Sequence, residues 1–178
     1  TTSDSGTSSG NRITISSPID ISGNLYGSNL TTGTGNSLNV YAADVSAGNI
    51  YNFNNLNFYL TSSVNAGDTM LNLTYSGGTD ISNAAVTAYM QGGSSLTTGD
   101  SVTLLTNSYG ITDTNTTYSG TIDEGVSLSY DLNVEKSGNS IVATLGDSSG
   151  GNDGGASSSA SNNTVNITSS RSEEHTSE

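Results

Sequence analysis

Apolar side chains along this chain recur in short runs separated by glycine, asparagine and aspartate, and no stretch of ten residues has the spacing of an amphipathic helix. In residues 126–134, five apolar side chains alternate with polar ones, which predicts a half-buried strand. Residues 136–139 then predict a turn, after which residues 140–145 return alongside as an antiparallel hairpin. We expect further strands in residues 12–16, 23–30, 37–42, 50–60, 70–75, 84–90 and 101–106. The pattern predicts an all-β protein with almost no helix.

The spacing of apolar residues changes within residues 50–60. Ile50, Phe53, Leu56, Phe58 and Leu60 are separated by three, three, two and two positions. A change of period inside one run suits a chain that turns a corner and continues in the next sheet of a coil. Glycine and asparagine, frequent in this half, tolerate the backbone conformations of such corners. Stacked coils are joined by backbone hydrogen bonds and need few inward side chains, which fits a chain with 31% hydrophobic residues.

The chain divides into four segments by composition. Residues 1–11 predict a flexible end, and residues 12–145 the stacked β region, with a cap at about residues 101–145. Residues 146–170 are rich in glycine and serine, which predicts a linker. Residues 171–178 (RSEEHTSE) resemble the translation of a sequencing-library adapter, so we expect this tail to be non-native, with an authentic polar tail as the alternative.

The charge balance excludes several classes of function. The 178 residues include 16 acidic and three basic side chains, one histidine and no cysteine, for a net charge of −13. Three cations are too few to hold a nucleic-acid backbone, and zinc fingers and thiol catalysis need cysteine. Without residues 171–178, two cations, 13 acids and no histidine remain, and the net charge is −11. The commonest general base and the favoured transition-metal ligands are then missing.

Several residues could carry chemistry, but each has a simpler explanation. Asp123 and Glu124 could form an acid–base pair, yet neighbours on a strand face opposite ways, and Gly125 favours a solvated turn. Asp147 and Asp153 suggest a calcium-binding repeat, but its G-G-x-G-x-D motif is not met. Asn-x-Ser/Thr sequons arise by chance in so polar a chain; they begin at Asn29, Asn72, Asn115, Asn162 and Asn166.

The nine tyrosines supply most of the aromatic content, and we expect them to cap coils or fill the core, with ligand contact as the alternative. They are Tyr26, Tyr41, Tyr51, Tyr59, Tyr75, Tyr89, Tyr109, Tyr118 and Tyr130. We therefore assign no catalytic, cofactor-binding or metal-binding residue from the sequence, and we expect no cofactor.

Four segments, taken together and in order, carry a resemblance to a known family. They are Ser46–Leu60, Ala66–Leu73 with Thr79–Ser82, Thr98–Leu105 and Gly125–Leu132. Over about residues 21–145 the chain resembles the late passenger region of a bacterial autotransporter, a type V secreted surface protein. The resemblance implies a right-handed parallel β-helix, or β-solenoid, ending in a small antiparallel hairpin cap that aids folding during export. It also implies an outer-membrane β-barrel and a signal peptide, both of which we expect outside these residues.

The resemblance leads to an expected function. We expect a structural or adhesive passenger segment at the bacterial cell surface or outer membrane, or secreted, that is not an enzyme and binds no nucleic acid. Its partners would be the barrel of the same chain and an unidentified glycan or protein ligand. The alternatives are the stalk of a large adhesin or a phage or surface-layer fibre exported by another route, and a β-helical polysaccharide-processing enzyme. We expect Tyr130 to share the apolar face of its strand, so that Tyr130→Asp would block folding.

Overall fold

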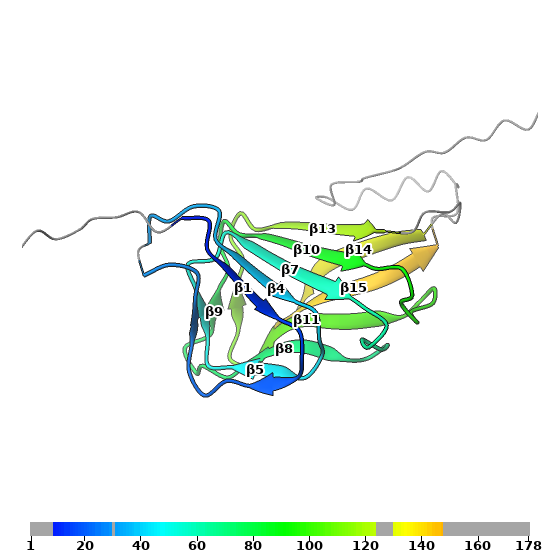
Figure 1. The fold of residues 1–178 in the computed structure, drawn as a ribbon, viewed down its shortest axis with the longest axis horizontal. Coiled ribbons are helices and arrows are strands. Elements are labelled where there is room, and N and C mark those ends of the chain that lie inside the picture. The colour runs from blue at the N-terminus through cyan, green and yellow to red at the C-terminus, as the bar shows by residue number, and fades with distance from the viewer. Residues whose placement is uncertain (1–8, 30, 124–129, 148–178) are drawn as a thin grey trace, which may run out of the picture.

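The computed structural model describes residues 9–29, 31–123 and 130–147, and in these residues the protein is all-β with no helix (Figure 1). The prediction of an all-β chain is confirmed. The strands are β1 (Arg12–Ile15), β2 (Ile19–Asp20), β3 (Leu25–Tyr26), β4 (Ser37–Val40), β5 (Val45–Ala47), β6 (Ile50–Tyr51), β7 (Asn55–Leu60), β8 (Thr69–Leu73), β9 (Thr79–Asp80), β10 (Ala85–Met90), β11 (Ser101–Asn107), β12 (Ile111–Thr112), β13 (Thr117–Ile122), β14 (Tyr130–Ser137) and β15 (Ser140–Asp147).

The strands form parallel sheets in which each strand pairs with the strand three further along the chain. The first sheet has the order β1-β4-β7-β10-β13 and is parallel throughout. The second has β2-β5-β8-β11 in parallel and continues into β15 and β14, which are antiparallel. Two short parallel pairs, β3–β6 and β9–β12, form a third side. The chain therefore contributes strands to these sheets in turn, and within the first two sheets each parallel strand lies beside the one three earlier in the chain.

The change of apolar spacing in residues 50–60 marks a corner, as predicted. Ile50–Tyr51 belongs to the third side, whereas Asn55–Leu60 belongs to the first sheet. Asn52 lies between them with a positive φ of 59°, and Asn83 and Asn115 have φ values of 63° and 57° just before β10 and β13. Asparagine tolerates this left-handed conformation better than most residues, so it recurs at the same corner of successive turns of the chain.

The core lies between the sheets and is built from columns of aligned apolar side chains. In the first sheet Val40 pairs with Phe58 and Phe58 with Ala88, and all three are fully buried. The second sheet supplies buried leucines such as Leu71 and Leu105, which are paired with each other in register. Because the register is kept from strand to strand, each strand needs few inward side chains, in accord with the low hydrophobic content.

The antiparallel hairpin of β14 and β15 follows the last parallel strand of the second sheet. Its turn lies between Ser137 and Ser140, as predicted, and β15 pairs with β11. The inward side chains Leu132, Val134 and Ile141 are buried. Beta14 also passes directly against β13, where a Cβ placed on Gly120 would lie only 2.0 Å from the carbonyl oxygen of Leu132. The hairpin therefore covers both the edge of β11 and the adjoining core.

Tyr130 is less buried than the other apolar residues of β14. Its side chain is 37% exposed, whereas Leu132 and Val134 on the same strand are buried. Tyr130 pairs with Asp147 at the end of β15. The pairing of β15 with β11 ends earlier, at Thr144. Among the described residues, no strand of the second sheet pairs with β15 beside Tyr130. That Tyr130→Asp blocks folding stays a prediction. The apolar positions predicted at 126 and 128 lie outside the described residues.

Candidate functional site

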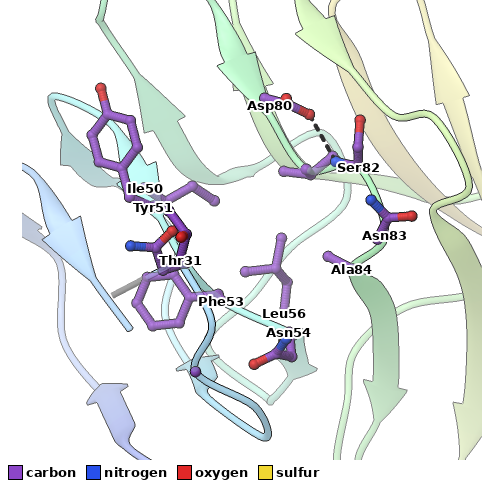
Figure 2. Close-up of a pocket in the computed structure, with 13 residues that line it drawn as sticks. Thr31, Ile50, Tyr51, Phe53, Asn54, Leu56, Asp80, Ser82, Asn83 and Ala84 are labelled. Atoms are coloured by element: carbon purple, nitrogen blue, oxygen red, sulfur yellow. Dashed lines mark hydrogen bonds between the residues drawn. The ribbon is translucent and has the colours of Figure 1, made fainter. Parts of the chain in front are cut away.

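The third side of the fold is interrupted between β6 and β9. The first sheet continues unbroken through β7–β10 and the second through β5–β8, but β6 and β9 form no ladder. The gap begins where Thr79 Oγ1 donates to Asn49 Oδ1 at 2.7 Å, and it ends where the Ala85 N–H donates to the Asn54 carbonyl at 2.8 Å. Between these two bonds the wall opens into a pocket of about 450 Å³ (Figure 2).

The floor of this pocket is part of the hydrophobic core. Ile50, Leu56, Ile81 and Ala84 line it, and each is at most 3% exposed. Figure 2 shows Leu56 between the two walls, with Thr31 and Phe53 on one side and Asp80, Ser82 and Asn83 on the other. The two walls come from successive turns of the chain, so the pocket exists because these corners are stacked without being bonded to each other.

Polar side chains form the rim, and most are held by one hydrogen bond, while a second polar atom of the same side chain has no hydrogen bond to any described residue. Asp80 Oδ1 accepts the Ser82 N–H at 2.9 Å, and Asn54 Oδ1 accepts a backbone N–H at 2.9 Å. Asn52 Nδ2 donates to the Ser28 carbonyl at 2.7 Å. Asn83 Oδ1 accepts a weak bond of 3.4 Å from Asn115 Nδ2. The rim is therefore fixed in place and still offers hydrogen-bonding groups to a ligand.

The pocket carries one acidic side chain and no basic one. Asp80 carries the only carboxylate among the residues that line the pocket, and no lysine or arginine is among them. Phe53 supplies a half-buried aromatic ring that packs against the core, and Tyr51 stacks on Tyr26 with ring centroids 5.2 Å apart. The lining thus suits an uncharged polar molecule with one apolar face.

A second group of aromatic residues lies on the outer surface of the first sheet. Tyr59 and Tyr89 are paired in register, and the rings of Tyr41, Tyr59 and Tyr89 form a continuous stack with centroids 4.1 and 4.8 Å apart. Burial, together with a hydrogen bond between the Tyr59 and Tyr41 hydroxyl groups, raises the pKa of Tyr59 to about 12. None of the nine tyrosines is fully buried, and Tyr118 alone among them packs against the core, so core filling, one of the two roles expected for them, is wrong for the others. The other expected role, the capping of coils, stays a prediction. Their hydroxyl groups favour the surface, where the parallel register stacks the rings.

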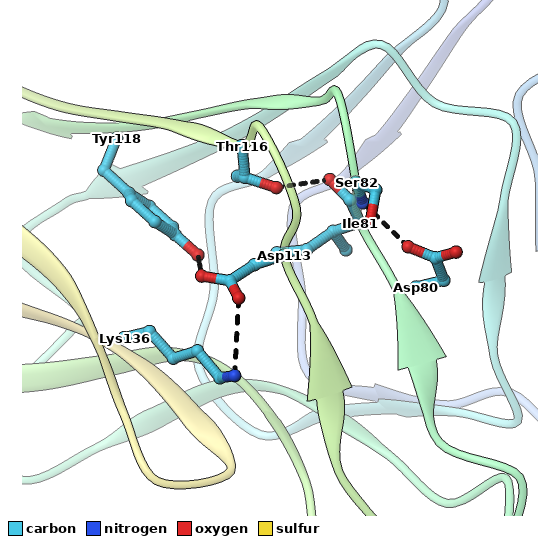
Figure 3. Close-up of polar contacts among 7 residues, drawn as sticks. All are labelled: Asp80, Ile81, Ser82, Asp113, Thr116, Tyr118 and Lys136. Atoms are coloured by element: carbon cyan, nitrogen blue, oxygen red, sulfur yellow. Dashed lines mark hydrogen bonds and ion pairs between the residues drawn. The ribbon is translucent and has the colours of Figure 1, made fainter.

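A polar cluster ties the hairpin to the turn before β13 (Figure 3). The Tyr118 hydroxyl donates to Asp113 Oδ2 at 2.6 Å, and Lys136 Nζ lies 3.4 Å from Asp113 Oδ1. The hydrogen bond from Tyr118 lowers the pKa of Asp113, whereas burial and the same hydrogen bond raise the pKa of Tyr118. Every charged group in this cluster is paired, which indicates a structural link between β14 and the preceding turn.

The residues considered from the sequence do not meet in one site. Asp123 is exposed after β13, and its neighbour Glu124 lies outside the described residues, as does Asp153. Asp147 ends β15. Asn29, Asn72 and Asn115 are exposed, whereas Asn162 and Asn166 lie outside the described part of the chain. Within residues 9–29, 31–123 and 130–147, no three histidine, cysteine, aspartate or glutamate side chains come close enough to hold a metal ion.

Sequence reasoning missed the pocket because its two walls lie about 30 residues apart, in segments without a shared motif. The signal that pointed to it was the change of apolar spacing around Phe53, which marks a corner. That signal locates one wall and gives no information on its neighbour.

Comparison of the chain with protein-family models, with curated proteins and with solved structures found no match. In the part of the chain that the structure describes, no helix is long and apolar enough to cross a membrane.

Proposed function

We propose that this chain is a structural and adhesive segment of a secreted bacterial surface protein, the passenger of an autotransporter. In this proposal the three sides are the faces of a right-handed parallel β-helix. The observation that supports it is the strand order, in which β1, β4, β7, β10 and β13 are successive neighbours and β2, β5, β8 and β11 repeat the rule. Such a chain can extend by adding turns, each held by its neighbours, which suits a rod that projects from a surface.

The hairpin supports a role in folding during export. An exposed parallel strand presents unpaired N–H and C=O groups that promote aggregation. Beta15 pairs with β11, and the buried side chains of Leu132, Val134 and Ile141 cover the adjoining core. We propose that the hairpin serves as the cap on which the preceding turns fold.

A binding role is favoured over a catalytic one by the chemistry of the pocket. General acid–base catalysis at a saccharide requires two suitably placed carboxyl groups. Asp80 is the single carboxylate among the pocket's lining residues, and its Oδ1 is engaged by the Ser82 N–H. This arrangement can hold a ligand, whereas it supplies no second group to activate water.

An export assay tests the proposal. The full chain is joined to the outer-membrane barrel of an autotransporter and produced in a Gram-negative host, and intact cells are probed by antibody and by protease. We expect the wild-type segment at the surface with a protease-resistant core, and Val134→Asp, which places a charge in the cap, to be degraded before display. Glu135→Gln on the exposed face of the same strand is the matched control. Wild-type display of Val134→Asp, or no display of the wild type, would overturn the proposal.

A further inference from the structure

The pocket between β6 and β9 has the volume of a small-molecule site. Ligand pockets usually have volumes of roughly 300–1,000 Å³ and hold a few placed polar groups. This one is an open hollow of about 450 Å³ with polar side chains at its rim. Because Ile50, Leu56, Ile81 and Ala84 behind it are each at most 3% exposed, the half-buried Phe53 supplies its apolar surface. We infer that it binds one neutral sugar residue of a glycan, or a short neutral saccharide. The inference rests on the adhesive role proposed above and names the class of ligand.

The unused polar atoms of the rim match hydroxyl groups. Among the described residues, no hydrogen bond engages Asp80 Oδ2, Asn54 Nδ2 or Asn83 Nδ2. The first is an acceptor and the other two are donors. A sugar hydroxyl both donates and accepts, so adjacent hydroxyls can satisfy a carboxylate and an amide together. A ligand that only donates or only accepts would leave part of this rim unpaired, at a cost in affinity.

The charge of the pocket selects against acidic ligands. Asp80 lines it without a lysine or arginine, so a sialic acid, a uronic acid or a phosphate would meet a like charge with no compensating cation. A simple cation would pair with Asp80 but would leave the amide donors of Asn54 and Asn83 without acceptors. An uncharged polyol satisfies both the carboxylate and the amides.

The aromatic ring provides the apolar part of the contact. Phe53 is half-buried against the core and lines the pocket on the wall opposite Asp80 and Asn83 (Figure 2). The C–H face of a pyranose ring can pack on such an aromatic surface while its hydroxyls point to the polar wall. The opposition of an aromatic wall and a polar wall therefore matches the two faces of a sugar.

The rim is organised before a ligand arrives. The Ser82 N–H holds Asp80, the Ser28 carbonyl holds Asn52, and a backbone N–H holds Asn54. Side chains that are already ordered lose less conformational freedom when a ligand binds. Weak binding at each site is then sufficient when several copies of the protein bind the same glycan-covered surface together.

Saturation-transfer NMR on the full chain tests the inference. The probes are methyl glycosides of glucose, galactose, mannose, fucose and N-acetylglucosamine, the disaccharides lactose, maltose, cellobiose and chitobiose, and, as acidic probes, N-acetylneuraminic acid and glucuronic acid. We expect at least one neutral probe to bind, with a Kd on the order of 1 mM for a single sugar unit. The double variant Asp80→Ala/Asn83→Gly should weaken that binding at least tenfold. Both side chains are exposed, and glycine accepts the positive φ of 63° at position 83, so the thermal unfolding of the variant should stay close to that of the wild type.

Asp131→Ala, which removes an exposed carboxylate from β14 far from the pocket, is the matched control and should leave binding unchanged. Absence of binding by every neutral probe, equal binding by the double variant, or stronger binding of the acidic probes would each overturn the inference. A chain that passes the export assay and binds no neutral sugar refutes this inference alone. Sugar binding that depends on Asp80 and Asn83 supports it even if export fails, which would refute only the proposed function.

Discussion

A single methyl group added at Gly120 should weaken the attachment of the hairpin to the rest of the protein. Gly120 lies in β13, where β14 crosses it, and an added Cβ would lie 2.0 Å from the Leu132 carbonyl oxygen and 2.8 Å from its carbonyl carbon. Real Cβ atoms essentially never approach another heavy atom within 3.0 Å. Gly120→Ala therefore requires the backbone of β14 or β13 to move by about 1 Å.

The loss of stability in Gly120→Ala depends on which atoms have to move to make room for the added methyl group. Overpacking a well-packed interior costs typically about 1–3 kcal/mol, and flexible side chains account for the low end of that range. Here the obstacle is backbone that is fixed on its other side by the β14–β15 ladder and by the buried Leu132 and Val134. We expect a loss of about 3 kcal/mol, reduced by roughly 0.5 kcal/mol because alanine restricts the unfolded chain more than glycine does. For a domain of this size, that corresponds to a fall in Tm of about 10 °C.

Thermal and urea unfolding followed by circular dichroism measures this loss. The matched control is Gly92→Ala, because Gly92 has no positive φ and an added Cβ would meet only the Asp123 carbonyl oxygen at 3.9 Å. Its stability should stay within about 0.5 kcal/mol of the wild type. If Gly120→Ala unfolds at the same urea concentration as Gly92→Ala, the close contact between β13 and β14 is not present in the protein, and the argument for a packed cap fails.

Two further predictions concern polar groups. Asn107 is fully buried, and its side chain bonds the Thr79 hydroxyl, which in turn bonds Asn49. Asn107→Ala should therefore cost about 3 kcal/mol in urea unfolding, since it leaves buried polar groups unpaired, and a loss below 0.5 kcal/mol would contradict this. Tyr118→Phe removes the hydrogen bond that lowers the pKa of Asp113, so it should cost about 1 kcal/mol at pH 7. A lowered pKa in the folded state stabilises it above the unfolded pKa of about 3.9, and this contribution is lost as the pH falls through the folded value. The difference between wild type and Tyr118→Phe should thus shrink toward pH 2, and a difference independent of pH would contradict the assignment.

The sequence by itself determined that the protein is all-β and where two of its turns lie. Alternation in residues 126–134 and the turn after Lys136 predict the hairpin, and the change of spacing at Phe53 predicts a corner. These are local properties: an alternating run has an apolar face whatever it packs against, and a change of period requires a change of direction. The partial exposure of Tyr130 could not be predicted this way, because it depends on how far β11 extends beside the hairpin.

Only the tertiary structure decided which strands pair and where the pocket opens. Beta2, β5, β9, β12 and β13 were not predicted, since strands of two or three residues have no measurable period and β13 is mostly polar. They are strands because a neighbouring turn of the chain presents a parallel partner in register, as β10 does for β13 and β12 does for β9. The pocket arises where that pairing fails between β6 and β9, although the strands on both other sides stay paired. Whether two segments about 30 residues apart meet, and whether they bond when they do, depends on the stacking of whole turns, which no local pattern records.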